Sequence, residues 1–391
     1  MTKPFLFWAL IGTIGICSNN LWAVNGEPDT TIAIPEFVIT AQRSKSTSID
    51  RPESISKLNS SDVRLLMAAS APDVLSAIPN VWMQRTNLGG GSPFLRGLTG
   101  YHTLILIDGI RFNNSTFRSG PNQYLNTLDP NIIDNKEVMR GQGSVPYGSD
   151  ALGGVVQIFT KSPEFSDTGR KIKASTFGRY MFRDMQKIFC VDMEASSANS
   201  AVSVGASIKE FGDIISGKGL SKLSPTGYSE NSIDFKFRQR IKSKHIITGT
   251  FQHQKQNDVP LYHKIISGDY SLYQFDPQQR IFSYLRLESN YESLFFSRVT
   301  YTISYQNSLE KRVKKKTASS VTKIEEDKVS SVNCTLELLS KPISFWTISS
   351  GLEIYQDFIR SEATVSLRSG TPLAILPAWH RGDKFYLAFL G

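Results

Sequence analysis

Polar and apolar residues alternate with a period of two from about residue 171 to the end of the chain. Within 201–211, the apolar side chains on even positions are Val202, Val204, Ala206 and Ile208. Segments 295–305 and 346–358 repeat the pattern. Because successive side chains of a strand point to opposite faces, this alternation predicts a series of β-strands with one apolar and one polar face.

The connections between these predicted strands have two lengths. Short turns are expected near 197–200, 242–244, 290–293 and 341–344, and long polar loops near 212–227, 257–277, 311–326 and 360–383. In an up-and-down antiparallel sheet, alternate connections lie at the same end. Short turns at one end and long loops at the other are typical of outer-membrane β-barrels.

The residues before this region have a different pattern of polar and apolar positions. Segment 61–163 predicts a small α+β domain, with short helices over 61–69 and 73–78 and strands over 103–107 and 154–160. Asp108-Gly109 is a tight-turn signal directly after the first of these strands. Residues 24–60 are polar apart from the alternating island 34–41, which indicates a flexible arm with one extended segment.

The predicted fold class is therefore a membrane all-β protein. An incomplete antiparallel outer-membrane β-barrel of about ten strands over 164–391, the last near 384–390, follows the small α+β domain. Barrels whose lumen is plugged have roughly 22 strands, so about ten strands cannot close around a domain of this size. We expect the sequence to be the front part of a longer barrel.

The first residues resemble a secretory signal. Lys3 precedes an apolar run from Phe5 to Ile16, which is too short to span a bilayer, and Leu21-Trp22-Ala23 is a plausible cleavage site. We expect residues 1–23 to be a signal peptide. A lipoprotein signal at Cys17 is disfavoured because Ile16 stands where a small residue is required. Cys190 and Cys334 are expected to be separate thiols.

Composition excludes several classes of protein. The mean hydropathy is −0.21, and the sequence lacks the apolar runs of roughly 20 residues that a polytopic helical membrane protein needs. The net charge of +9 comes with no zinc-finger or ribonucleoprotein motif, which disfavours nucleic-acid binding. The concentrated basic run 311–316 is expected in an outer loop, either solvated or facing lipopolysaccharide or an acidic ligand.

No catalytic or metal-binding pattern stands out. The glycine-rich stretch 140–154 lacks the Gly-Lys-Ser/Thr ending of a phosphate-binding loop, and none of the five histidines belongs to a His-Glu-x-x-His motif. We expect a protein that is not an enzyme and holds no cofactor or structural metal.

Residues 72–162 resemble the plug domain of TonB-dependent outer-membrane receptors. The matching pieces, in order, are Pro72-Asp73-Val74-Leu75, Pro79-Asn80-Val81, Phe94-Leu95-Arg96-Gly97, 104–111, 138–141 and 143–156. Gln142 and Pro146 depart from the usual pattern. The resemblance implies a cell outer membrane location and contact with outer-membrane lipid.

Segment 36–43 resembles the family's TonB box. The implied coupling residues are Glu36, Phe37, Val38, Ile39 and Thr40, and the implied partners are TonB and the inner-membrane energising complex. An extended segment in a polar arm can add a strand to the sheet of another protein, which suits this role. The alternative is an ordinary linker with a chance apolar patch.

The stretch 113–124 is similar to the haem/haemoglobin-type branch of the family, as is Asp258-Val259-Pro260. The implied function is energised uptake of an iron-containing ligand, namely haem, a haem protein or a ferric siderophore. Ligand would bind at the plug apices 85–92 and 111–118, with the candidate residues Arg85, Asn87, Arg111, Asn113, Asn114, Phe117 and Arg118. His102, His253 and His263 are candidate iron ligands or ordinary surface histidines. The alternatives are a truncated or degenerate barrel without transport activity and, with no positive feature, a surface adhesin.

Overall fold

The computed structural model describes residues 37–38, 46–47, 54–117, 125–217, 219, 221–293, 296–343, 346–366, 372–376 and 381–390. The expected signal peptide, most of the expected arm, the box residues Glu36, Ile39 and Thr40, and the candidate residue Arg118 lie outside the described residues.

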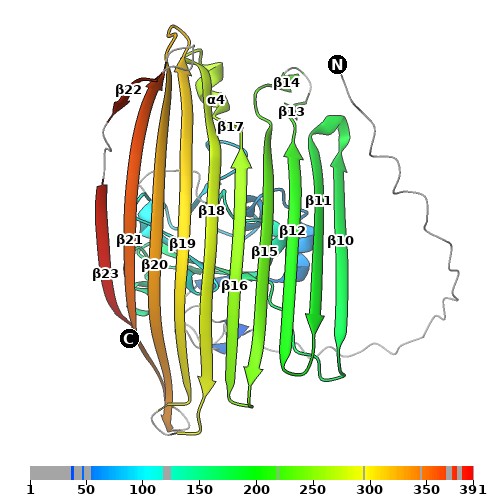
Figure 1. Ribbon diagram of the computed structural model, residues 1–391, viewed down its shortest axis with the longest axis vertical. Coiled ribbons are helices and arrows are strands. Elements are labelled where there is room, and N and C mark those ends of the chain that lie inside the picture. The colour runs from blue at the N-terminus through cyan, green and yellow to red at the C-terminus, as the bar shows by residue number, and fades with distance from the viewer. Residues whose placement is uncertain are drawn as a thin grey trace, which may run out of the picture. The chain divides into compact units, whose positions relative to one another are not determined.

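One large antiparallel sheet forms most of the described chain (Figure 1). Its long strands, in spatial order, are β10 (Lys171–Met181), β11 (Gln186–Ser196), β12 (Ser200–Phe211), β15 (Tyr228–Ile241), β16 (His245–Asn257), β18 (Tyr270–Asn290), β19 (Arg298–Lys316), β20 (Thr322–Ile343), β21 (Trp346–Ser366) and β23 (Arg381–Leu390). The short strands β17 (Val259–Pro260) and β22 (Pro372–Leu376) pair with β18 and β21. Each long strand lies beside its predecessor in the sequence, which confirms the up-and-down arrangement.

The two faces of the sheet have opposite polarity. In β12, the side chain of Ile208 is 64% exposed, whereas the neighbouring Lys209 is only 1% exposed. In β19, Tyr301 and Ile303 are exposed, whereas Thr302 is buried. The apolar positions therefore face outward and the polar positions face the α+β part of the chain, as in a sheet whose outer face contacts lipid.

The ends of the sheet differ as well. At one end, here called the turn end, connections such as 197–199 and 242–244 are short. The other, the loop end, carries the hairpin of β13 (Ile214–Ile215) and β14 (Lys222–Leu223), the helix α4 (Tyr262–Ile266) and β17 (top of Figure 1). The short 3-10 turn η4 (Phe182–Asp184) joins β10 to β11 there.

The expected loop over 311–326 is wrong, because β19 continues to Lys316 and β20 begins at Thr322. The basic run is the end of a strand, and its inward charges have partners on the neighbouring strand. Arg312 Nη2 lies 2.6 Å from Asp327 Oδ2, and Lys314 Nζ lies 2.7 Å from Glu325 Oε1. The expected long loops over 257–277 and 360–383 are also shorter than predicted, since β18 begins at Tyr270 and β21 reaches Ser366.

The α+β part contains a five-stranded sheet in the order β3 (Ser54–Leu58), β8 (Ile133–Arg140), β9 (Gly154–Thr160), β6 (Thr103–Ile107) and β7 (Ile110–Arg111). Strands β6 and β9 are parallel and match the predicted bounds. The other elements are α1 (Ser60–Leu65), α2 (Ala71–Ser76), α3 (Ser144–Tyr147), the 3-10 turns η2 (Gly100–His102) and η3 (Pro130–Ile132), and a hairpin of β4 (Trp82–Gln84) and β5 (Ser92–Phe94). Helix α2 begins earlier than predicted because Asp73 accepts a hydrogen bond from the backbone N–H of Ser70.

The core of the α+β part extends to the large sheet. Ile105, Val138 and Ile158 are fully or nearly fully buried in one cluster that also contains Phe282 and Tyr284 from β18. Cys190 and Cys334 are free thiols, as predicted. No helix among the described residues is long and apolar enough to cross a membrane.

Gly154 occupies a position where a side chain does not fit. Its φ is +155°, and a Cβ atom there would lie 2.4 Å from the carbonyl oxygen of Met139 on β8. We expect Gly154→Ala to lower the free energy of unfolding by about 1–3 kcal/mol, because the backbone must shift to relieve the overlap. Chemical denaturation of the detergent-solubilised protein measures this. Gly178→Ala in β10 is the control, since nothing lies within 4 Å of its Cβ position, and equal losses in both variants would contradict the expectation.

Candidate functional site

A buried ion cluster joins the α+β part to the inner face of β12 and β15. Lys209 Nζ donates hydrogen bonds of 2.6 Å to Asp129 Oδ1 and of 2.6 Å to Glu230 Oε1. Ser207 and Ser232 hydroxyls donate to the other Asp129 oxygen. All three charged side chains are almost completely buried. An ammonium ion between two carboxylates, away from water, requires all of these partners to be in place.

Asp129 is ionised in this setting. Burial by itself raises the pKa of the Asp129 carboxyl, but the Lys209 ammonium and the serine hydroxyls outweigh burial and lower this pKa to about 2. Since the pKa is below its usual value, Asp129 contributes stability at pH values above about 4, and this contribution is lost as the pH falls toward 2. The ion pair between Asp129 of the α+β part and Lys209 of the sheet is therefore formed at neutral pH.

A second cluster forms around Asp108, in the tight turn that follows β6. Lys236 of β15 donates to Asp108 Oδ2 over 3.1 Å and to Thr160 Oγ1 over 2.6 Å. From β18, the Tyr284 hydroxyl donates to Asp108 Oδ2 over 3.1 Å. Burial raises the pKa of Asp108, but the Lys236 ammonium and the hydrogen bonds from Thr160 together outweigh it, so the net pKa is lowered. Asp108 thus carries a negative charge that both β15 and β18 stabilise.

At the loop end, a pocket with a volume of about 450 Å³ lies between the α+β part and the connections of the sheet. One side consists of the segment Gln84–Leu88, which begins at the last residue of β4. The other side consists of residues from the β13–β14 hairpin, from β17 and from α4, namely Ile214, Leu223, Thr226, Pro260, Tyr262 and His263. This loop-end pocket brings together two of the candidate residues, Arg85 and Asn87, with the candidate His263.

The polar side chains of this pocket differ in whether they already have a partner. Arg85 forms an ion pair with Asp73 of α2, and both side chains remain partly exposed. Asn87 is 7% exposed, and its Oδ1 accepts a hydrogen bond of 3.0 Å from the Gly90 N–H. The Asn87 Nδ2 group has no hydrogen-bond partner among the described residues. The pocket therefore offers a buried donor next to a guanidinium group.

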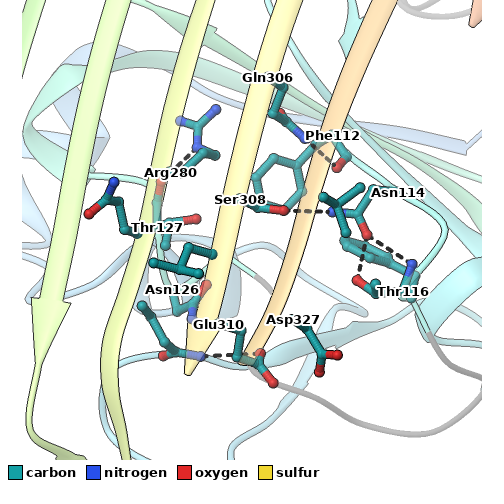
Figure 2. A pocket seen from close by; sticks show the side chains of 15 residues that line it. Phe112, Asn114, Thr116, Asn126, Thr127, Arg280, Gln306, Ser308, Glu310 and Asp327 are labelled. Atoms are coloured by element: carbon teal, nitrogen blue, oxygen red, sulfur yellow. Dashed lines mark hydrogen bonds between the residues drawn. The ribbon is translucent and has the colours of Figure 1, made fainter. Parts of the chain in front are cut away.

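The second predicted apex, 111–118, lines a smaller cavity of about 70 Å³ (Figure 2). Asn114, Thr116 and Phe117 form one side of this upper cavity, and β18, β19 and β20 form the other. Asn114 Nδ2 donates to Ser308 Oγ of β19 over 3.3 Å. By the same measure this cavity is about one sixth the size of the loop-end pocket.

Three candidates of the second apex make contacts within the α+β part. Arg111 donates to Asp150 Oδ2 over 3.0 Å and to the backbone carbonyls of Tyr147 and Ser149. Asn113 is 1% exposed and bridges the Ile105 N–H and the Thr103 carbonyl, so it braces the segment beside β6. Phe117 packs edge-on against Phe112, with ring centroids 5.9 Å apart.

Tyr262 and Thr226 line the loop-end pocket but were not predicted as site residues. The only sequence signal for them is their place in long connections.

The segment predicted to couple to TonB is described only in part. Phe37 and Val38 form the short strand β1 (Phe37–Val38), which pairs antiparallel with β2 (Ser46–Thr47). The described part of the segment is therefore extended backbone, as an added strand requires. Elsewhere among the described residues, no three His, Cys, Asp or Glu side chains gather as a metal site.

Residues 47–155 match the family model described as the TonB-dependent receptor plug domain. This part of the chain is therefore similar to a TonB-dependent receptor plug. It is also 35% identical over 128 residues to a "Vitamin B12 transporter BtuB" of Vibrio vulnificus, an alignment that covers 32% of this chain and 20% of that protein.

Solved receptors share the fold beyond the plug. The ferripyoverdine receptor of the Pseudomonas aeruginosa outer membrane aligns with a TM-score of 0.63 at 13% identity, over 87% of this chain and 50% of that one. The "Copper transporter OprC" aligns with a TM-score of 0.62 at 15% identity, over 81% and 49%. The chain thus spans about half the length of these receptor structures.

These findings confirm the predicted fold class, a plug followed by an antiparallel sheet of about ten strands that matches receptor barrels. They also confirm the predicted outer-membrane location. The family consists of transporters without enzymatic activity, so the expectation of a protein that is not an enzyme is confirmed as well. The relatives and solved receptors are named for vitamin B12, copper and siderophores, and they do not show the haem branch, so the ligand is a matter for proposal.

Removing the Lys209 ammonium should weaken the attachment of the plug to the sheet, because it pairs with Asp129 and Glu230. We expect Lys209→Met to lower the free energy of unfolding by about 3–5 kcal/mol, because it leaves Asp129 and Glu230 buried without a counter-charge. Adding Asp129→Asn and Glu230→Gln should recover most of the loss. Chemical denaturation measures both. Lys222→Met is the matched control, since Lys222 is 63% exposed and its ion pair with Asp213 is worth little; a loss of similar size there would contradict the expectation.

Proposed function

We propose that this receptor captures haem at its loop end and moves it across the outer membrane with energy supplied through TonB. The observation that carries the proposal is the loop-end pocket, in which the plug segment Gln84–Leu88 faces α4 and the β13–β14 hairpin. In outer-membrane barrels the long loops face outward, so this pocket opens to the cell exterior.

The chemistry of the pocket suits an iron macrocycle with acidic side groups. Tyr262 and His263 both line the pocket, and tyrosine and histidine are known axial ligands of haem iron. Arg85 and the Asn87 Nδ2 donor can bind carboxylates such as the propionates of haem, because guanidinium and amide groups donate hydrogen bonds to carboxylate oxygens. His263 also follows Asp258-Val259-Pro260, which resembles the haem-type branch.

A corrinoid is the second candidate ligand. The observation in its favour is the 35% identity to a protein named as a vitamin B12 transporter, although only a fifth of that protein is aligned. The solved ferripyoverdine receptor shares the fold. At 13% identity that likeness supports the fold and carries no weight for the ligand.

TonB and the inner-membrane energising complex are the proposed partners in the periplasm. Main-chain hydrogen bonds from residues 36–40 to a sheet edge of TonB would transmit force, because several parallel bonds share the load. The two described residues of this segment already pair in extended form with Ser46 and Thr47. Binding to TonB would replace this short ladder with a longer one.

Growth of cells that express the receptor from its own gene tests the ligand. In a strain without other haem receptors, we expect growth with haem as the only iron source and a drop in haem uptake of at least tenfold for His263→Ala. His245→Ala is the matched control, since His245 lies at the turn end and contacts Ser289. Uptake of a corrinoid or a ferric siderophore in place of haem would reject haem as the ligand, and uptake of none of the three would favour a degenerate barrel without transport.

Val38→Pro tests the coupling segment. Proline lacks the N–H group and disturbs strand pairing, so we expect haem binding at the cell surface to persist while energised uptake falls to background. Radiolabelled haem measures both quantities in the same cells. Uptake at the unsubstituted rate would show that this segment does not couple to TonB.

A further inference from the structure

The outer face of β20 and β21 carries an apolar band (strands labelled in Figure 1). Its exposed side chains include Val332 and Leu336 on β20 and Ile354 on β21. Exposed aromatic side chains, Trp346 and Phe358, mark the two ends of the band on β21. At about 3.3 Å per residue they lie about 40 Å apart along the strand, which at a tilt of about 45° is a height of about 28 Å. This height matches the roughly 30 Å of the hydrocarbon core, so Phe358 marks the edge of the hydrocarbon on the side of the loop end.

The next outward-facing position toward the loop end is positively charged on both strands. Lys328 of β20 and Arg360 of β21 are directly opposite each other in register, and both side chains are exposed. The residues that follow them, Val329 and Ser361, are buried on the inner face, as the alternation of a strand requires. On the other side of Arg360, Arg381 of β23 holds the same register position. This basic row lies about 5 Å above the edge of the hydrocarbon.

A row of this kind is unfavourable without an anion, because like charges directly opposite each other destabilise a sheet. The carboxylate of Glu362 meets part of this need. Arg360 Nε donates to Glu362 Oε1 over 2.6 Å, and Arg360 Nη2 contacts the same oxygen. Since a guanidinium group has five donors, Arg360 can bind a second acceptor. Lys328 forms no ion pair with any residue whose side chain the structure describes.

The acidic residues of this surface lie one step further from the membrane than the basic row. Glu326 of β20 is directly opposite Glu362 of β21, and Lys311 of β19 is opposite Glu326. The basic row therefore lies on the membrane side and the two carboxylates on the outer side. This order favours an anion at the level of the lipid headgroups, below the carboxylates that would repel it.

We propose that Lys328 and Arg360 bind a phosphate group of lipopolysaccharide in the outer leaflet. The long loops of outer-membrane barrels face outward, so the basic row lies in the outer leaflet, where lipopolysaccharide is the anionic lipid. Its phosphate groups are attached to the sugars that bear the acyl chains, at the height of this row. Guanidinium and ammonium groups form strong charge-assisted hydrogen bonds with phosphate. A phosphate between the two side chains replaces their mutual repulsion with two attractions and fixes the height of β20 and β21 in the membrane.

This surface is on the outer face of the sheet, so it takes no part in the loop-end pocket. The inference therefore holds whichever ligand the receptor transports, and its test needs no transported ligand.

The sheet also supplies a matched control cation. Lys255 of β16 pairs in register with Gln279 of β18. The same row continues through Leu309 to Lys328. Because both register partners of Lys255, Asn231 and Gln279, are uncharged, Lys255 is an isolated cation in the row that contains Lys328.

Titration of the detergent-solubilised receptor with fluorescently labelled lipopolysaccharide tests the site. Lys328→Gln combined with Arg360→Gln removes both charges, and we expect the affinity to fall at least tenfold because the charge-assisted hydrogen bonds are lost. Lys255→Gln should change the affinity less than twofold. A chelator is present throughout, so that a divalent cation held by Glu326 or Glu362 cannot bridge to the phosphate.

Two further probes identify the group that is bound. Lipopolysaccharide from which the phosphates have been removed enzymatically should bind the unsubstituted receptor at least tenfold more weakly than the intact lipid. Phosphatidylglycerol, added in the same detergent, should also bind at least tenfold more weakly. Chemical denaturation without added lipid shows whether the double variant is folded. It should unfold at the same denaturant concentration as the unsubstituted receptor or at a higher one, since two opposed like charges have been removed.

Several outcomes overturn the proposal. Unchanged affinity in the double variant, an equal loss with Lys255→Gln, or full affinity for the dephosphorylated lipid would each remove the phosphate site. Equal binding of phosphatidylglycerol would reject lipopolysaccharide as the occupant. Unfolding of the double variant at a lower denaturant concentration would show that Lys328 and Arg360 support the fold instead.

Discussion

The structure depends on the pairing of Lys209 with Asp129 and Glu230. A sheet that faces lipid must turn its polar side chains inward, and no bulk water reaches them once a plug covers that face. Each inward charge then needs a partner that only the plug or a neighbouring strand can supply. The ion clusters at Asp129 and Asp108 meet this need, and they bind two parts of the chain that would each be incomplete alone.

The same constraint applies to the strands further along the sheet, where Arg280 of β18 donates to the Thr127 carbonyl and Asp357 of β21 accepts from the Ser115 N–H. Buried ion pairs hold two parts of a chain firmly together. Separating them is costly, because each charge is then left buried without a partner. Neutral hydrogen bonds beside small cavities, such as that from Asn114 to Ser308, part and reform at lower cost. Buried charged groups of β12, β15, β18 and β21 therefore hold the plug together with neutral hydrogen bonds of this kind.

The sequence predicted the strands well, because a period of two in residues such as Val204, Ile208 and Tyr301 is a local signal. It also predicted β6 and β9 and the turn at Asp108. It failed at residues 311–316, where dense positive charge suggested a loop, because the compensating Glu325 and Asp327 lie on the next strand and their register is not visible in one sequence. The meeting of Lys209 with Asp129 across 80 residues of sequence could not be predicted for the same reason. Of the residues that line the loop-end pocket, Arg85 and Asn87 were named as candidates from the resemblance to a family. Tyr262 was not, because a single sequence does not show that α4 lies beside this segment of the plug.

Strands β18 and β20 contain 21 and 22 residues, which makes them about 70 Å long. Even when tilted by about 45°, they rise about 50 Å, more than the roughly 40–45 Å thickness of a whole bilayer with its headgroups. Their ends must therefore stand clear of the lipid as a protein collar. Ligands that approach this collar meet paired arginine, lysine and glutamate side chains before they meet the charged membrane surface, whose field fades within about 8 Å in physiological salt. The height of these strands thus separates the encounter with a ligand from the electrostatics of the membrane that holds the receptor.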